Sequence, residues 1–133
     1  MRFDIAGTGT GRQALVVLAH GIVGWAWCGA LIGIGRQLFS MEAALIIHAI
    51  GGPLGFSLIA WFYFRRFGYT TPLQTAAAFL GVVVTLDLLL VAPVFEGSYA
   101  MFTSTLGTWL PFALIFTAVN VTGQLAAGRG VSR

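Results

Sequence analysis

The sequence has few charged residues and no lysine. Charged side chains make up 8% of the 133 residues, whereas hydrophobic ones make up 58%. Soluble domains carry about 25% charged and about 45–50% apolar residues. We therefore predict a chain surrounded mainly by lipid. Its net charge of +3 comes from arginine alone, which indicates membrane orientation and not a nucleic-acid partner.

The sequence also lacks the features of several enzyme classes. Its single cysteine, Cys28, excludes an internal disulfide. No His-Glu-x-x-His, Cys-x-x-Cys or Gly-x-Ser-x-Gly motif is present. The glycine-rich segment 7–11 has no Gly-Lys-Ser/Thr after it, which argues against a phosphate-binding loop. The sequence therefore contains no motif that indicates an enzyme of these classes.

Four long apolar stretches are separated by short polar links. The stretches cover residues 13–34, 43–64, 73–95 and 106–126. Each is long enough to cross the hydrocarbon core as a helix, and such short links make consecutive helices antiparallel neighbours. We predict an all-α integral membrane protein, an antiparallel four-transmembrane-helix bundle over residues 13–126, with tails at 1–12 and 127–133.

The distribution of arginine predicts how this bundle is oriented. Cytoplasmic segments near helix ends carry an excess of Lys and Arg. Six arginines fall on one side of the predicted membrane: Arg2, Arg12, Arg65, Arg66, Arg129 and Arg133. We predict a multi-pass protein of a bacterial cytoplasmic membrane with both termini cytoplasmic. On the other side, Arg36, Glu42 and Glu96 form either a charged vestibule or a simple ion pair.

A few polar residues interrupt the apolar stretches, and these are the candidate functional residues. A charge facing lipid at a helix centre costs about 2.5–3.5 kcal/mol, so such side chains point inward. The helical rise sorts them into two layers. The inner layer lies about 9–11 Å above the cytoplasmic ends of the spans and the outer layer about 21–24 Å above them. The inner layer holds His20, Ser57 and Asn120, and the outer layer holds Cys28, His48 and Asp87.

Asp87 is the most informative of these residues. Its neighbours one turn away are all apolar, so its partner has to come from another helix. A contact with His48 would be either a proton-exchanging pair or a neutral hydrogen-bonded one. The alternative is a purely structural role, in which Asp87 pins two helices together.

Glycine and proline predict where helices come close or break. The pair Gly29 and Gly33 favours a close helix contact. Pro53 frees a backbone carbonyl one turn earlier, near Ala49, so the second helix is expected to kink or open beside His48. Pro93 and Pro111 interrupt the third and fourth stretches. Broken helices next to polar side chains are typical of transporter substrate sites.

Four functions fit these features. The leading one is a proton-coupled transporter or channel component that uses the intramembrane His and Asp residues. The second is an accessory or assembly subunit whose polar residues serve helix recognition. A metal site at Cys28, His48 and Asp87 is a third, and a haem or quinone carrier is a fourth. A bis-histidine haem is disfavoured, because His20 and His48 differ by about 13 Å in depth. No cofactor is predicted. The lipid bilayer is the expected partner, together with a homodimer or larger membrane complex.

Overall fold

The computed structural model describes residues 8–130, with side chains over 11–126, and this part of the chain is helical throughout apart from short links. Its elements are α1 (Thr8–Leu38), α2 (Met41–Arg66), α3 (Pro72–Leu86), η1 (Asp87–Glu96), η2 (Ala100–Thr103), η3 (Thr105–Trp109) and α4 (Leu110–Gly130). η1 and η3 are π-helical, and η2 is a 3₁₀ turn.

Four helical segments are long and apolar enough to cross a membrane, which confirms the prediction of four such helices. They are Gly11–Leu38, Met41–Arg66, Pro72–Glu96 and Thr105–Ala126. α1 begins at Thr8, inside the expected tail 1–12, and α4 runs to Gly130, inside the expected tail 127–133. Arg2, Arg133 and the side chain of Arg129 lie outside the described residues.

Local chemistry explains where the helices begin. Ser40 caps α2, because its hydroxyl accepts a hydrogen bond from the backbone N–H of Ala43 at 3.1 Å. Thr71 and Gln74 form a reciprocal capping box at the start of α3, and Pro72 occupies the first helical turn. Gly97 ends η1 with a positive φ of 66°, a conformation that glycine adopts without strain.

A hydrogen-bonded cluster closes the link between α2 and α3. The Tyr63 hydroxyl lies 2.7 Å from the Thr70 hydroxyl and accepts the Thr70 backbone N–H at 3.1 Å. The Thr70 hydroxyl also contacts that of Thr75, which donates to the Thr71 carbonyl at 2.8 Å. Tyr63 and Thr75 are fully buried, so this turn is held firmly in place.

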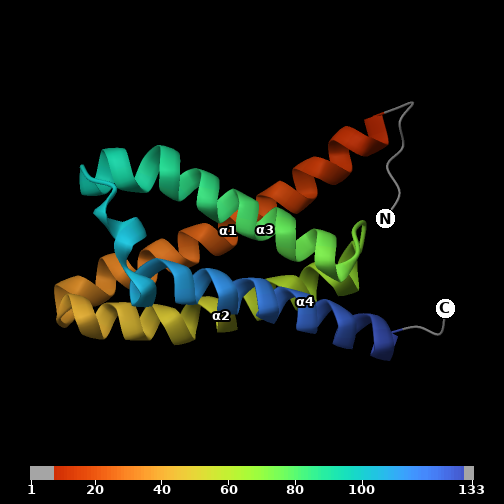
Figure 1. Cartoon of the computed structure of the whole chain (residues 1–133). Coiled ribbons are helices and arrows are strands. Elements are labelled where there is room, and N and C mark those ends of the chain that lie inside the picture. The colour runs from red at the N-terminus through yellow and green to blue at the C-terminus, as the bar shows by residue number, and fades with distance from the viewer. Residues whose placement is uncertain (1–7, 131–133) are drawn as a thin grey trace.

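The four spans form a bundle in which consecutive helices run in opposite directions (Figure 1). The main packing pairs are α1 with α2, α2 with α4, α1 with α3, and α3 with α4. α2 and α3 are therefore not one of these pairs, although a short link joins them. Two of the pairs, α1 with α3 and α2 with α4, run in parallel. The prediction of antiparallel neighbours thus holds for α1–α2 and α3–α4 but not for the link in the middle of the chain.

α1 and α3 cross near the middle of the bundle (Figure 1). The crossing is close at Gly21, where a Cβ would lie 3.1 Å from Cγ2 of Val82. Beyond that point the two spans diverge toward both ends of the bundle (Figure 1). The buried core fills the centre, with Phe56, Phe79, Ile115 and Val119 at most 1% exposed.

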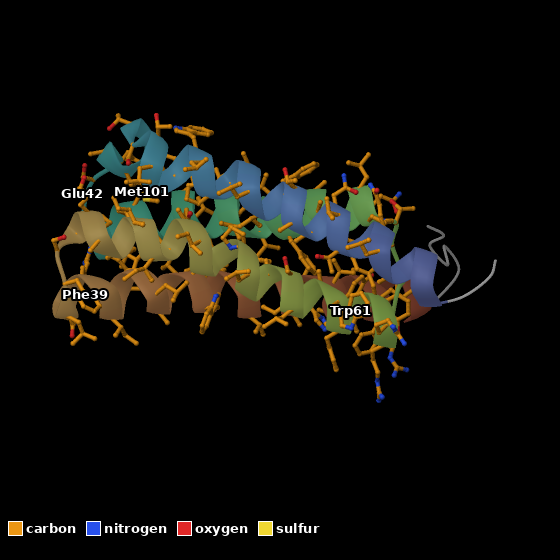
Figure 2. All side chains as sticks on the ribbon, turned by 90° about the horizontal axis from the view of Figure 1, so that it is seen from below. Phe39, Glu42, Trp61 and Met101 are labelled. Carbon is orange, nitrogen blue, oxygen red and sulfur yellow. The ribbon has the colours of Figure 1, made fainter. Side chains whose placement is uncertain are left out.

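Two ends of the bundle can be named from their arginines. The Arg36 end holds the α1–α2 link and the segment from Glu96 to Ser104, and the Arg65 end holds the α2–α3 link. Figure 2 places Phe39, Glu42 and Met101 at the first end and Trp61 toward the second. Arg12, Arg65 and Arg66 all belong to the Arg65 end by the helix directions.

The third and fourth spans depart from α-helical geometry, whereas the second does not. α2 is continuous through Pro53, so the expected opening beside His48 is absent from this helix. The π-helical η1 contains Pro93, and η3 ends just before Pro111. Proline removes a backbone donor, and π-helical turns are frequent at functional sites. The irregular backbone is thus found at the Arg36 end of the third and fourth spans.

Candidate functional site

A cavity of about 810 Å³ lies between the four spans at the Arg36 end. Most of its lining is apolar, with a few polar side chains, and its size falls in the range of small-molecule sites. All four spans contribute to it at helical spacing: Trp25, Cys28, Gly29, Ile32, Gly33 and Arg36 from α1, Met41, Leu45 and His48 from α2, Val83, Asp87, Val91 and Phe95 from the third span, and Ser104, Thr108, Phe112 and Ile115 from the fourth.

Asp87 is bound by a tryptophan on another helix. The indole Nε1 of Trp25 donates a hydrogen bond to Oδ1 of Asp87 at 3.1 Å. Trp25 lies one turn beyond the close crossing at Gly21, where α1 and the third span begin to separate, and its ring bridges the widening gap. The partner thus comes from another helix as expected, but it is Trp25 on α1 and not His48 on α2.

His48 and Cys28 lie together beside Gly52. A Cβ at Gly52 would be 3.3 Å from Sγ of Cys28 and 3.6 Å from Nε2 of His48. His48 is 6% exposed, and its Nδ1 has no hydrogen-bond partner among the described residues. A buried polar atom without a partner is costly.

Arg36 and Glu96 form an ion pair at the outer limit of the cavity. Nη1 of Arg36 lies 3.0 Å from Oε2 of Glu96, and both side chains are more than one-third exposed. Glu42, the third residue expected here, is exposed in the first turn of α2 and is not among the residues that line the cavity. The structure thus contains the simple ion pair, and this pair borders the cavity.

The cavity is open on one side. α2, η3 and α4 form a back wall whose lining residues include the buried His48, Thr108, Phe112 and Ile115. On the other side α1 and η1 are not one of the closely packed helix pairs. There the lining residues Ala26, Gly29 and Phe95 are exposed. Two polar bridges frame this opening, because the first residue of η1 bonds Trp25 and the last one bonds Arg36.

Gly29 and Gly33 do not make the close helix contact that their spacing predicts. A Cβ at either position would meet nothing within 4 Å, and both residues line the cavity. The close approach between α1 and α2 occurs at other glycines, Gly24 against Phe56 and Gly35 against Ala44. Gly29 and Gly33 therefore keep the cavity wide on the α1 side.

The segment after η1 covers the Arg36 end of the cavity. Ala100 and Met101 from η2 line it. The hydroxyl of Thr108 donates to the Met101 carbonyl at 2.6 Å, and Nε1 of Trp109 donates to the Phe102 carbonyl at 2.7 Å. These bonds hold η2 against the start of the fourth span.

The three residues of the predicted inner layer do not meet. Nδ1 of His20 donates a hydrogen bond to the Val16 carbonyl at 2.7 Å, and its ring packs against Phe62, Tyr63 and Phe67. Because a carbonyl only accepts, this Nδ1 carries the proton. Asn120 accepts from Gln124 on its own helix at 3.0 Å, and Ser57 is half-buried on α2.

Apolar side chains separate these residues from the cavity. Phe56 and Phe79 are fully buried and in ring contact, with centroids 6.0 Å apart, and Phe79 also contacts Tyr63. This aromatic block fills the centre of the bundle between the cavity and the Arg65 end. The two polar layers are not connected by a polar path through the described residues in this conformation.

A second, smaller cavity of about 400 Å³ lies where α1 and α3 diverge toward the Arg65 end. Gln13, Val17, Tyr69 and Gln74 are among its lining residues. Its walls carry almost no polar surface, although the buried Oε1 of Gln13 lacks a hydrogen-bond partner within the described part of the chain. None of the predicted site residues borders this cavity.

The described side chains do not form a metal site. No group of three His, Cys, Asp or Glu residues in this part of the chain lies close enough to hold a metal ion. Cys28, His48 and Asp87 border one cavity without converging on a point. His20 packs in the aromatic cluster and His48 borders the cavity, so the two imidazoles do not face a common space that could hold a haem.

Comparison with protein-family models, curated proteins and solved structures gives no significant match.

Two features of the site were missed in the sequence. Trp25 was not among the candidates, although a tryptophan in an apolar helix has an N–H that needs an acceptor. It lies four residues after Gly21 and three before Cys28, and a search for an acceptor on another helix would have led to Asp87. The π-helical η1 was also missed, and only Pro93 signalled it.

Proposed function

We propose that the protein is a multi-pass membrane carrier that couples substrate movement to protons through Asp87. The observation that supports this most directly is the 810 Å³ cavity, which contains a carboxylate and is closed on one side by the aromatic block. A site accessible from one side only is the arrangement expected for one state of an alternating-access carrier.

Membrane insertion with the Arg65 end in the cytoplasm is part of this proposal. The described arginines Arg12, Arg65 and Arg66 gather at that end, as the positive-inside rule requires. Large apolar side chains are exposed along all four spans, including Leu15, Leu58, Leu89 and Leu125, and a lipid environment accounts for them. In this orientation the cavity opens toward the outer half of the membrane.

A carrier agrees better with the geometry than a channel does. A channel needs a continuous polar path, whereas Phe56 and Phe79 fill the bundle below the cavity. In a carrier this block has to part and re-form during each cycle. Asp87 exchanges its proton for substrate in one state, because an empty cavity with an ionised carboxylate is costly to move through hydrocarbon.

The unique cysteine provides a test that requires no knowledge of the substrate. Cys28 borders the cavity, and the cationic thiol reagent MTSET does not cross membranes. Right-side-out and inverted vesicles would be treated with MTSET, and the modified fraction of Cys28 measured by mass spectrometry of the purified protein. We expect rapid modification from the Arg36 end and slower, measurable modification from the Arg65 end.

The variant Asp87→Asn imitates the protonated carboxyl and should change the ratio of the two rates. Glu42→Gln is the matched control, since Glu42 is an exposed carboxylate at the same end outside the cavity lining, and it should leave the ratio unchanged. If Cys28 is never modified from the Arg65 end, in wild type or in Asp87→Asn, the carrier proposal is wrong.

An accessory subunit is the second candidate, and one observation favours it. The α1–η1 side of the bundle is open and carries Gly29 and Gly33, where a partner helix could pack closely. In that case Cys28 would react from one side at most, and its reaction would be blocked in the native complex but not in the isolated protein.

A further inference from the structure

The charged side chains that line the cavity do not neutralise one another completely. Arg36 and Glu96 neutralise each other at its outer limit. Within the described residues Asp87 has no cationic partner, and its Oδ1 is bound only by the neutral indole of Trp25. A buried imidazole without a carboxylate partner is stable as the neutral form, so His48 adds no charge. The cavity therefore carries one uncompensated negative charge when Asp87 is ionised.

The rest of the lining suits an apolar body. Ile32, Leu45, Val83 and Val91 supply aliphatic surface. The rings of Trp25, Phe95 and Phe112 also border the cavity. Aromatic faces attract cations, and the effect is largest where water is excluded.

The opening between α1 and η1 admits a bulky molecule. Gly29 and Gly33 present no side chain there, and nothing lies within 4 Å of where their Cβ atoms would be. Exposed Ala26 and Phe95 stand on the two sides of this opening. A hydrophobic molecule can thus reach Asp87 from the side of the bundle.

We infer that the cavity binds an organic monocation with a large apolar body, whose charge pairs with Asp87 while its body fills the space beside Gly29 and Gly33. This inference names the substrate class of the carrier proposed above and rests on that proposal for its purpose. Arg36 and Glu96 stay paired when such a ligand is bound.

A pair of ions with one shape and opposite charge tests the inference. Tetraphenylphosphonium and tetraphenylborate would be titrated into the purified full-length protein in lipid nanodiscs, with binding measured by equilibrium dialysis. Protein-free nanodiscs give the lipid background, which is subtracted for each ion. We expect saturable binding of tetraphenylphosphonium and at least tenfold weaker binding of tetraphenylborate.

Two variants, each with a matched control, test the charge of Asp87 and the space in the cavity separately. Asp87→Asn should weaken tetraphenylphosphonium binding at least tenfold, whereas Glu42→Gln should leave it unchanged. Gly29→Leu fills the cavity without altering any charge and should also weaken binding. Gly81→Leu is its control, because Gly81 is exposed on α3 and likewise has nothing within 4 Å of its Cβ position.

Equal or tighter binding of tetraphenylborate overturns the inference, and so does unchanged cation binding by both Asp87→Asn and Gly29→Leu. The result is separable from that of the carrier test. Charge-selective binding without two-sided access to Cys28 would contradict the carrier proposal but support the cation-binding site. Two-sided access to Cys28 without charge-selective binding would support the carrier proposal but contradict an organic cation as its substrate.

Discussion

The ring of Phe56 lies directly against the backbone of Gly24, so that a Cβ at position 24 would overlap with Cε1 of the ring. Phe56 is fully buried and cannot move aside easily. We expect Gly24→Ala to lower the free energy of unfolding by about 1–3 kcal/mol through overpacking. Unfolding in mixed detergent micelles, followed by circular dichroism, measures the change.

Gly29→Ala is the control for this prediction. It lies five residues further along α1, and its Cβ would meet nothing within 4 Å. Alanine is the better helix former, so Gly29→Ala should be neutral or should stabilise by up to about 1 kcal/mol. Equal destabilisation by the two variants would contradict the packing described here.

The bond from Trp25 to Asp87 should couple the two residues energetically. Trp25→Phe keeps an aromatic ring but removes the donor to a carboxylate, which costs about 1–3 kcal/mol. Asp87→Asn should cost less in the Trp25→Phe background than in the wild type. A double-mutant cycle of unfolding free energies measures this coupling. Trp27→Phe, which removes a bond to the neutral Gly51 carbonyl, should show no coupling to Asp87→Asn.

The charge of Asp87 should also be visible in the chemistry of Cys28, which borders the same cavity. We expect cationic MTSET to modify Cys28 faster than anionic MTSES, after each rate is divided by that for a free thiol. Asp87→Asn should reduce this preference, because the attraction is electrostatic. A preference that survives Asp87→Asn would show that another group sets the potential in the cavity. Mass spectrometry over a time course gives both rates.

The orientation of the bundle in the membrane can be tested with reporter fusions. If the Arg65 end faces the cytoplasm, green fluorescent protein fused after Arg133 should fluoresce, and alkaline phosphatase fused there should be inactive. Fusions after Phe39 should give the reverse pattern. The opposite result at both positions would place the cavity toward the cytoplasm.

The number and extent of the long apolar helices could be predicted because hydrophobic length alone indicates them. Every predicted span lies inside a helical segment of the structure. The order of the helices around the bundle could not be predicted in this way. It depends on which surfaces fit together, such as Gly21 against Val82, and this fit has no signature in a hydropathy pattern.

The candidate site was predicted in part. Helical rise was enough to place Cys28, His48 and Asp87 at similar depth, and the structure brings all three to one cavity. Depth does not determine direction around the helix axis, so the sequence could not indicate that Asp87 bonds Trp25. The roles of Gly29 and Gly33 were also unpredictable, because the same spacing occurs in glycines that pack closely and in glycines that border open space.

The cluster around Tyr63 and Thr70 has a mechanical consequence. The hairpins α1–α2 and α3–α4 are joined through the backbone only at the Arg65 end, where this cluster fixes the link. At the Arg36 end the bridge between α1 and η1 is a single exposed ion pair, which is worth at most about 1 kcal/mol. A force that pulls α1 and η1 apart is therefore resisted least at the Arg36 end, where it leaves the packing of α2 against α4 in place.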